Sequence, residues 1–294
     1  MRTRQLGPSG LVVSVVGLGC NNFGGRIGLE ETRAVVDAAI DEGITLFDTA
    51  DIYGNRGGSE TALGEVLAGR RDRIVLATKF GMEMGDGTEA RGSREYLRKA
   101  LDASLERLRT DRIDLYQYHR PDGITPIEET VGAMEELVAE GKVLALGSSN
   151  FDAAQVEAAG TRLVTAQNEY SLLEREAESE LVPVLERLGI GLLPYFPLAS
   201  GLLTGKHRRD RIAEGTRMTE RAHDVTVETW DRLEELERLA RSMGRTILEL
   251  AIGGLAAMPA VASVIAGATK PEQVRANAAA GAWEPTADEL VALR

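Results

Sequence analysis

The sequence has few cysteines, few histidines and few aromatic residues, and it lacks an excess of positive charge. Its one cysteine, Cys20, excludes an internal disulfide, and with only three histidines present a structural zinc site is unexpected, so we predict no metal. The formal net charge is −12, from 34 basic and 46 acidic residues. Nucleic acids and anionic membranes both attract positively charged surfaces, so neither is an expected partner.

The sequence also lacks an N-terminal apolar segment of the kind that secretory signals carry, and we therefore expect a cytoplasmic protein. Residues 250–269 contain no charge over a length that spans a membrane. Pro259 and three glycines interrupt this stretch, which predicts the end of a helix, a turn and the buried strand 261–265 rather than a membrane helix.

Strand-like and helix-like segments alternate along the whole chain after a predicted hairpin at 2–14. Apolar, β-branched runs occur near 13–18, 44–48, 74–79, 113–118, 143–148, 163–167, 190–195 and 261–265. Amphipathic segments lie between them at 29–42, 59–69, 93–109, 126–140, 152–160, 177–188, 228–256 (two helices) and 270–280. Such alternation predicts parallel strands with right-handed crossovers, and the continuous apolar runs predict a sheet buried on both faces.

Two α/β architectures fit this alternation. An open sheet of the Rossmann type should carry G-x-G-x-x-G after its first strand, and GLGCNNFGG at 17–25 does not satisfy that pattern. We therefore predict a (β/α)8 TIM barrel with an N-terminal β-hairpin, forming a single domain over 1–294. The long polar segment 204–226 is the candidate for a mobile lid.

Polar side chains stand at the ends of four successive predicted strands. Asp48 ends one strand and Tyr53 follows it, while Lys79, His119 and the pair Ser149–Asn150 end the next three. In a parallel barrel the functional groups sit where strands end, so these residues predict an active site at one rim.

The combination of tyrosine, lysine, aspartate and histidine indicates proton transfer to a carbonyl oxygen. A phenol has a pKa near ~10 and is a poor acid at neutral pH. An ammonium about 4 Å away contributes on the order of 4 kcal/mol at an effective dielectric of ~20, which would lower the pKa of Tyr53 by about two to three units. Asp48 would keep Lys79 charged, and a neutral His119 would polarise the carbonyl. Another group must then supply hydride.

These motifs, in this order, resemble the aldo-keto reductases over essentially the whole chain. FDTADIYG at 47–54 resembles the family segment with its aspartate and tyrosine, ATKF at 77–80 the lysine strand, and YQYHRPD at 116–122 the histidine strand. The resemblance implies catalytic Asp48, Tyr53, Lys79 and His119. It also implies reduction of an aldehyde or ketone with hydride from nicotinamide C4 and a proton from Tyr53.

The same resemblance implies a binding site for NADPH or NADP+, with NAD as the less expected cofactor. GSSNF and QNEYSLLER resemble the segments that bind the carboxamide, YFPLASGLLTGK the one that stacks on the nicotinamide and cradles the pyrophosphate, and GATKPEQVRAN the site for the 2′-phosphate and adenine. The implied cofactor-binding residues are Gly19, Cys20, Asn21, Asp48, Ser149, Asn150, Gln167, Tyr195, Phe196, Pro197, Leu198, Ser200, Gly201, Lys206, Gly267, Thr269, Lys270, Gln273 and Asn277. The residue types support this, because a small Gly267, a following helix N-terminus and local cations suit a phosphate.

Three positions depart from the pattern of many relatives. Gln273 stands where an arginine often grips the 2′-phosphate, so the preference for NADP over NAD is less secure. Phe196 replaces a serine, and Arg120 stands after His119 where large aromatics often line the pocket. A small carbonyl substrate in a wider, more polar pocket is expected.

Two other functions stay open: an NAD-linked sugar or alcohol dehydrogenase, and a non-catalytic nicotinamide-binding subunit like the β subunits of voltage-gated potassium channels. The sequence leaves the oligomeric state open.

Overall fold

The computed structural model describes residues 1–216, 218–221, 223 and 225–293, and its centre is an eight-stranded parallel sheet. The order of the strands in this sheet is β10-β3-β4-β5-β6-β7-β8-β9. Their bounds are β3 Val16–Gly19, β4 Leu46–Asp48, β5 Val75–Phe80, β6 Ile113–Tyr118, β7 Val143–Ser149, β8 Thr165–Gln167, β9 Gly191–Leu192 and β10 Val264–Gly267.

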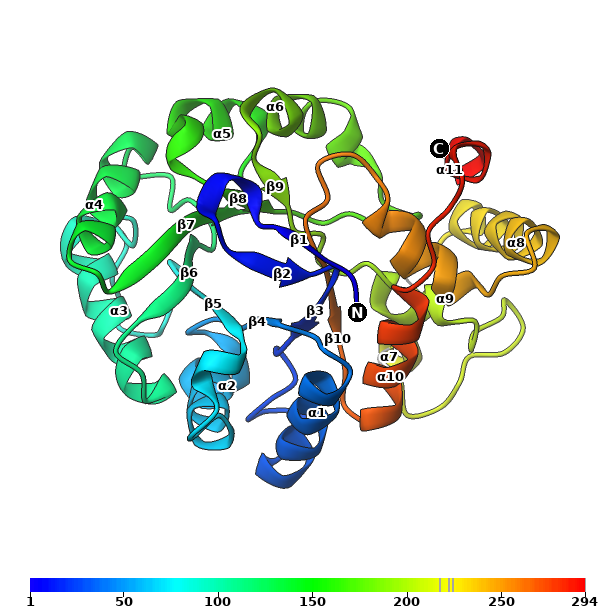
Figure 1. The fold of residues 1–294 in the computed structure, drawn as a ribbon, viewed down its shortest axis with the longest axis horizontal. Helices are drawn as coiled ribbons and strands as arrows, with labels where there is room; N and C mark the ends of the chain where they lie inside the picture. The colour runs from blue at the N-terminus through cyan, green and yellow to red at the C-terminus, as the bar shows by residue number, and fades with distance from the viewer. Residues whose placement is uncertain (217, 222, 224, 294) are drawn as a thin grey trace.

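The two edges of this sheet meet. The main-chain N–H of Leu192 on β9 donates to Ala260 O (2.7 Å), and the N–H of Ala262, just before β10, donates back to Leu192 O (2.8 Å). The sheet therefore closes into the predicted (β/α)8 barrel, which is visible as the ring of arrows in Figure 1.

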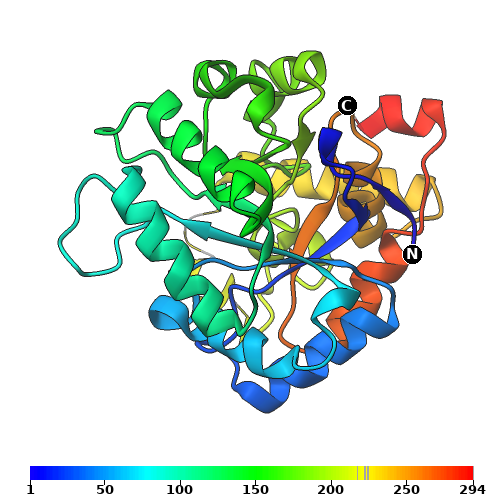
Figure 2. The same cartoon turned by 60° about the vertical axis from the view of Figure 1, so that its left-hand side comes forward.

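Helices surround this ring on the outside, as Figures 1 and 2 show from two directions. The α-helices are α1 Leu29–Asp41, α2 Tyr53–Val66, α3 Arg94–Leu108, α4 Ile127–Ala139, α5 Ala153–Ala159, α6 Leu181–Leu188, α7 Met218–Arg221, α8 Val227–Ser242, α9 Ile247–Glu249, α10 Pro271–Ala280 and α11 Ala287–Leu293. Short 3-10 turns are η1 Gly7–Ser9, η2 Arg71–Arg73, η3 Gly160–Arg162, η4 Glu176–Glu178 and η5 Ala199–Thr204, and η7 Leu250–Gly254 is a π-helical turn.

The predicted hairpin covers the amino-terminal end of the barrel. Strands β1 Thr3–Gln5 and β2 Val12–Ser14 pair antiparallel and lie across the ring in Figure 1. Leu6 and Val13 pack into an apolar cluster with barrel side chains such as Leu46 and Leu115. At Gly7 (φ 52°) a Cβ would lie 2.2 Å from Val164 O, so only glycine lets the hairpin approach this closely. With this end closed, the opposite rim is left for a site.

The structure corrects several predicted boundaries. The run 13–18 is divided between β2 and β3, because the chain bends after Ser14 to leave the hairpin and enter the barrel. The segment 177–188 is helical mainly over α6, and the C-terminal helix α11 was missed. The predicted lid 204–226 lies partly outside the described residues, and its mobility stays a prediction.

The uncharged segment 250–269 forms the π-helical turn η7, a turn and the buried strand β10, as the interruptions at Pro259 and the glycines indicate. Among the described residues, no helix is both long enough and apolar enough to cross a membrane.

Candidate active site

One cleft of about 720 Å³ opens at the carboxyl ends of the barrel strands. Its volume lies within the ~300–1,000 Å³ typical of ligand pockets. Every residue that the sequence indicated as cofactor-binding lines this cleft, together with Tyr53 and His119. The remaining predicted catalytic residue, Lys79, lies buried at the end of β5, where its ammonium pairs with Asp48 of the cleft wall.

Asp48, at the end of β4, is the centre of a buried hydrogen-bond network. Its Oδ2 accepts from Lys79 Nζ (2.7 Å), and its Oδ1 accepts from Gln117 Nε2 (3.0 Å) and Gln167 Nε2 (2.9 Å). Lys79 Nζ also donates to Thr49 O (2.9 Å). Three strands that follow β4 thus supply donors to one carboxylate, which satisfies a charge that would otherwise be costly to bury.

The lysine in this network is charged. Burial alone would lower the pKa of Lys79, but the neighbouring Asp48 carboxylate and Tyr53 phenol raise it above its usual value. The expected Asp48–Lys79 ion pair is therefore present, and it lies directly beside the tyrosine.

Gln117 is a member of this buried network that the sequence reasoning missed. It lies on β6 between Tyr116 and Tyr118, and its side chain is fully buried against Asp48. The available signal was a lone amide within an otherwise apolar and aromatic strand. Gln167 was expected only to meet the cofactor, yet it also holds Asp48.

Tyr53 lies between the ammonium and the imidazole. Lys79 Nζ is 5.1 Å from the centroid of the Tyr53 ring, and the His119 ring meets it edge to face at 5.7 Å and 88°. Burial raises the pKa of Tyr53, while Lys79 lowers it and Asp48 raises it. The expectation of a net lowered pKa is therefore wrong for this state, because desolvation of the phenolate outweighs the ammonium.

His119 is neutral. Burial, and then the charges of Lys79 and Arg120, lower its pKa to about 3. Its main-chain N–H donates to Phe80 O (2.8 Å), while its Nδ1 has no hydrogen-bond partner among the described residues. The imidazole thus lies beside Tyr53 as an uncharged hydrogen-bonding group, as the sequence predicted.

A strained backbone segment follows Tyr53. Residues 54–57 all have positive φ, including the non-glycine residues Asn55 (61°) and Arg56 (66°). At Gly54 a Cβ would lie 2.5 Å from Phe23 O, so this turn packs against the loop that follows β3. Such strain is tolerated where surrounding structure fixes it, and here it fixes the loop that carries Tyr53.

Asn150 joins three parts of the cleft wall. Its Nδ2 donates to His119 O (2.9 Å), and its Oδ1 accepts from the hydroxyl of Tyr195 (2.8 Å). The residue itself is left-handed, with φ 57°. The side chains of Asn150 and Tyr195 and the main chain of His119 thus connect the segments that follow β7, β9 and β6.

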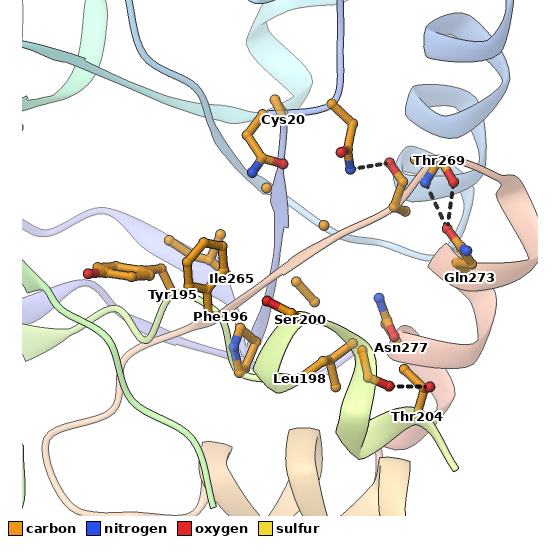
Figure 3. A pocket seen from close by; sticks show the side chains of 18 of the residues that line it. Cys20, Tyr195, Phe196, Leu198, Ser200, Thr204, Ile265, Thr269, Gln273 and Asn277 are labelled. Carbon is orange, nitrogen blue, oxygen red and sulfur yellow. Dashed lines mark hydrogen bonds between the residues drawn. The ribbon is translucent and has the colours of Figure 1, made fainter. Parts of the chain in front are cut away.

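The next wall of the cleft is a loop of left-handed residues. Positive φ occurs at Phe196 (50°), Ala199 (44°), Ser200 (57°) and Gly201 (110°). Figure 3 shows Tyr195 and Phe196 side by side at one end, with Ser200 and Thr204 further along the cleft. Strained loops of this kind are common at ligand clamps, and Phe196, Ser200 and Gly201 of this loop line the cleft.

Gln273 closes the far end. Its Oε1 accepts from both the main-chain N–H (2.7 Å) and the hydroxyl (3.2 Å) of Thr269, as the dashed lines in Figure 3 show. The exposed cations Lys206 and Lys270 line the same part of the cleft. Thr269 was expected to donate to a phosphate, whereas in this structure both of its donors are used by Gln273.

The donors present fit a nicotinamide dinucleotide. Ser149, Asn150 and Gln167 place amide and hydroxyl groups beside Tyr195. This part of the cleft, which also contains Tyr53 and His119, is called the reacting end below. The strained loop and the two lysines lie toward the far end, where main-chain N–H groups and cations suit phosphates. A cleft of this volume, with polar groups around Tyr195 and cations elsewhere on its wall, fits the size and charge of such a cofactor.

The cleft contains residues that the sequence reasoning did not single out. These additional lining residues include Asn22, Arg26, Thr204, His207, Glu214, Leu248, Glu272 and Ala276. Half of them lie in loops whose path over the barrel end no local pattern predicts. Asn22 is anchored by donating to Ala268 O (3.2 Å), which ties the loops after β3 and β10 together.

The chain is similar to known proteins over almost its whole length. Residues 15–294 match the aldo/keto reductase family. The chain is 40% identical to an uncharacterized oxidoreductase, YrpG, of Bacillus subtilis (94% of this chain, 89% of that protein), and 36% identical to the aldo-keto reductase YhdN of the same organism (96% and 89%). It is also 35% identical to a probable voltage-gated potassium channel subunit beta of Oryza sativa (94% and 90%).

Proposed function

Because the chain belongs to the aldo/keto reductase family and is an NAD(P)-dependent oxidoreductase, we propose that it reduces an aldehyde or ketone to an alcohol with NADPH. The observation that carries this proposal is the buried Lys79–Asp48 pair beside Tyr53, with a neutral His119 across from the phenol. The bound cofactor supplies hydride to the carbonyl carbon.

Residues of the chain then protonate and position the carbonyl oxygen of the substrate. The Tyr53 hydroxyl gives its proton to the forming alkoxide, and the resulting phenolate is stabilised by the ammonium of Lys79. A high phenol pKa keeps the proton on Tyr53 until the alkoxide needs it. Asp48 keeps Lys79 charged and in place, and the neutral imidazole of His119 donates a hydrogen bond to the carbonyl oxygen.

The 2′-phosphate of NADPH would bind at the far end of the cleft, near Gln273. Lys270 and Lys206 supply charge there, and Gln273 has an amide Nε2 left to donate while its Oε1 holds Thr269. A hydrogen bond to a charged group contributes ~1.5–3 kcal/mol, so one or two contacts give a tenfold preference for NADPH, which needs ~1.4 kcal/mol.

Steady-state oxidation of NADPH and NADH with a panel of aldehydes, and reduction of NADP+ and NAD+ with sugars and alcohols, tests the function. We expect NADPH oxidation with aldehydes to have the highest kcat/KM. If only NAD+ reduction with sugars proceeds, the NAD-linked dehydrogenase replaces this proposal.

The likeness to the potassium channel subunit favours a second candidate, a regulatory nicotinamide-binding subunit. It predicts tight cofactor binding with no turnover of any carbonyl. The presence of Asp48, Tyr53, Lys79 and His119 around one cleft supports the enzyme instead.

A further inference from the structure

Arg120 is an exposed cation at the reacting end of the cleft. It follows His119 directly and lines the cleft together with Tyr53 and Tyr195. Its guanidinium forms no hydrogen bond or ion pair with any other residue in the part of the chain that the structure describes. Several other arginines of this acidic chain do pair with carboxylates, for example Arg98 with Glu140 and Arg107 with Glu60.

The charge of Arg120 reaches the groups around the reacting carbonyl. After burial and Lys79, it is the third cause that lowers the pKa of His119. Burial and then the Glu169 carboxylate raise the pKa of Tyr195, and Arg120 acts against that rise. Its positive charge therefore lies near the nicotinamide end and not with Lys206 and Lys270.

The cleft differs in charge from the rest of the molecule. Its described wall holds the cations Arg26, Arg120, Lys206 and Lys270 and three carboxylates, of which Asp48 is neutralised by Lys79. The whole chain carries a net charge of −12. An unpaired guanidinium beside the reacting end of such a cleft is a ready partner for an anion.

We propose that Arg120 binds an anionic group on the substrate, so that the enzyme prefers carbonyl compounds carrying a carboxylate or a phosphate. This rests on the proposed carbonyl reduction and names its substrate class. The guanidinium offers paired N–H donors that match either oxyanion. The anion only orients the substrate: hydride still goes to the carbonyl carbon, the proton still comes from Tyr53, and no bond to the anionic group changes.

The test compares matched pairs of aldehydes. Succinic semialdehyde is compared with butanal, and glyceraldehyde 3-phosphate with glyceraldehyde, by kcat/KM with saturating NADPH. We expect at least a tenfold preference for the anion in one of the pairs, which corresponds to about 1.4 kcal/mol, and the pair that shows it identifies carboxylate or phosphate. The preference should shrink as salt rises, since the contact lies in an open cleft.

Three variants assign the preference to a residue. Arg120→Met removes the charge but keeps much of the stem, and should bring the ratio of anionic to neutral kcat/KM close to one, mainly through KM. Arg120→Lys should keep a part of the ratio. The control Arg73→Met removes the same charge from an exposed residue before β5, at the other end of the barrel, and should leave the ratio as in the wild type.

Distinct results overturn the inference. Equal kcat/KM within both pairs in the wild type, with the neutral aldehydes still reduced, ends it while leaving the proposed function intact. A ratio that survives unchanged in Arg120→Met removes Arg120 from the assignment. A large loss of NADPH affinity in the Arg120 variants, measured by calorimetry without substrate, would make Arg120 a cofactor residue instead. If no aldehyde of either kind is reduced, the proposed function fails, and this inference fails with it.

Discussion

The buried part of the cleft around Asp48 (the floor) and its far end, where we propose that the phosphates bind (the phosphate end), are built in opposite ways. In the floor, Asp48 and Lys79 are buried and bonded to each other, and Gln117 and Gln167 complete the network. At the phosphate end, Lys206 and Lys270 are exposed and have no ion pair with any described residue. In the floor, the fold itself pairs each charge with a partner. At the phosphate end, the two lysine charges are not paired by any described residue.

Because of this difference, we expect the floor to determine the rate of the reaction and the phosphate end to determine the affinity for the cofactor. A preorganised group stabilises a transition state without reorganising during the reaction, so the floor should control turnover. Exposed cations gain their partner only when a phosphate arrives, so they should control binding. Substitutions in the two regions therefore ought to change different kinetic constants.

Tyr53→Phe should give the largest effect. Removing the hydroxyl removes the proposed proton donor, and we expect a loss of turnover of about 10²–10⁴-fold, with NADPH affinity changed less than about twofold. Single-turnover kinetics and calorimetry measure the two quantities. A variant that keeps more than about a third of wild-type turnover, with hydride transfer rate-limiting, would end the assignment of Tyr53.

Lys79→Met should be nearly as damaging and should also destabilise the fold. Without the ammonium the pKa of Tyr53 moves still higher, so the pH profile of alcohol oxidation should shift upward. Asp48 loses its counter-ion in the interior, which costs about 3–5 kcal/mol in urea unfolding. The matched control Lys99→Met breaks only an exposed pair with Asp86, so its urea unfolding should stay close to that of the wild type. A small loss with an unshifted profile would show that Lys79 is not part of the machinery.

Asp51→Asn should change stability and its pH dependence more than activity. Both carboxyl oxygens of Asp51 are buried without a hydrogen-bond partner among the described residues. Burial, and then Glu60, raise its pKa to about 7, while Arg107 and Lys79 act against this. The folded chain therefore holds a proton that the unfolded chain has released above about pH 4, and wild-type stability is lost as the pH rises through 7.

The amide that replaces the carboxyl group of Asp51 cannot ionise, so the variant should gain up to about 4 kcal/mol on the wild type between pH 4 and pH 8. Urea unfolding across this range measures the gain. The exposed control Asp41→Asn should run parallel to the wild type. A constant difference between Asp51→Asn and the wild type over the whole range would mean that Asp51 is already ionised.

Lys270→Ala should have the smallest effect and test the phosphate end. We expect NADPH to bind about three- to tenfold more weakly, with NADH and turnover at saturating cofactor nearly unchanged, since one exposed contact to a phosphate is lost. Gln273→Arg should act in the opposite direction. Calorimetry with both cofactors measures each change, and equal wild-type affinities for NADPH and NADH would contradict the NADP assignment.

Three of the predicted catalytic residues could be found from the sequence because each stands at the end of a strand in a recognisable motif. In a parallel barrel, strand ends converge at one rim, so Asp48, Lys79 and His119 were expected to meet there, and the structure brings Asp48 and Lys79 to 2.7 Å. Gln117 gave only a weak signal, because one amide within a strand does not reveal that its partner lies 69 residues away.

The sequence by itself therefore determined the alternation that makes a barrel, the hairpin before it and many, though not all, of the residues that line the cleft. Only the tertiary structure decided which way the pKa of Tyr53 moves, because burial is a property of the assembled fold and here exceeds the pull of one ammonium. It also decided that Thr269 donates to Gln273. Likewise, only the fold shows that Arg120, which has no ion pair among the described residues, lines the same cleft as Tyr53 and His119. Local patterns place residues on strands and loops, whereas distances between loops depend on how the whole barrel closes.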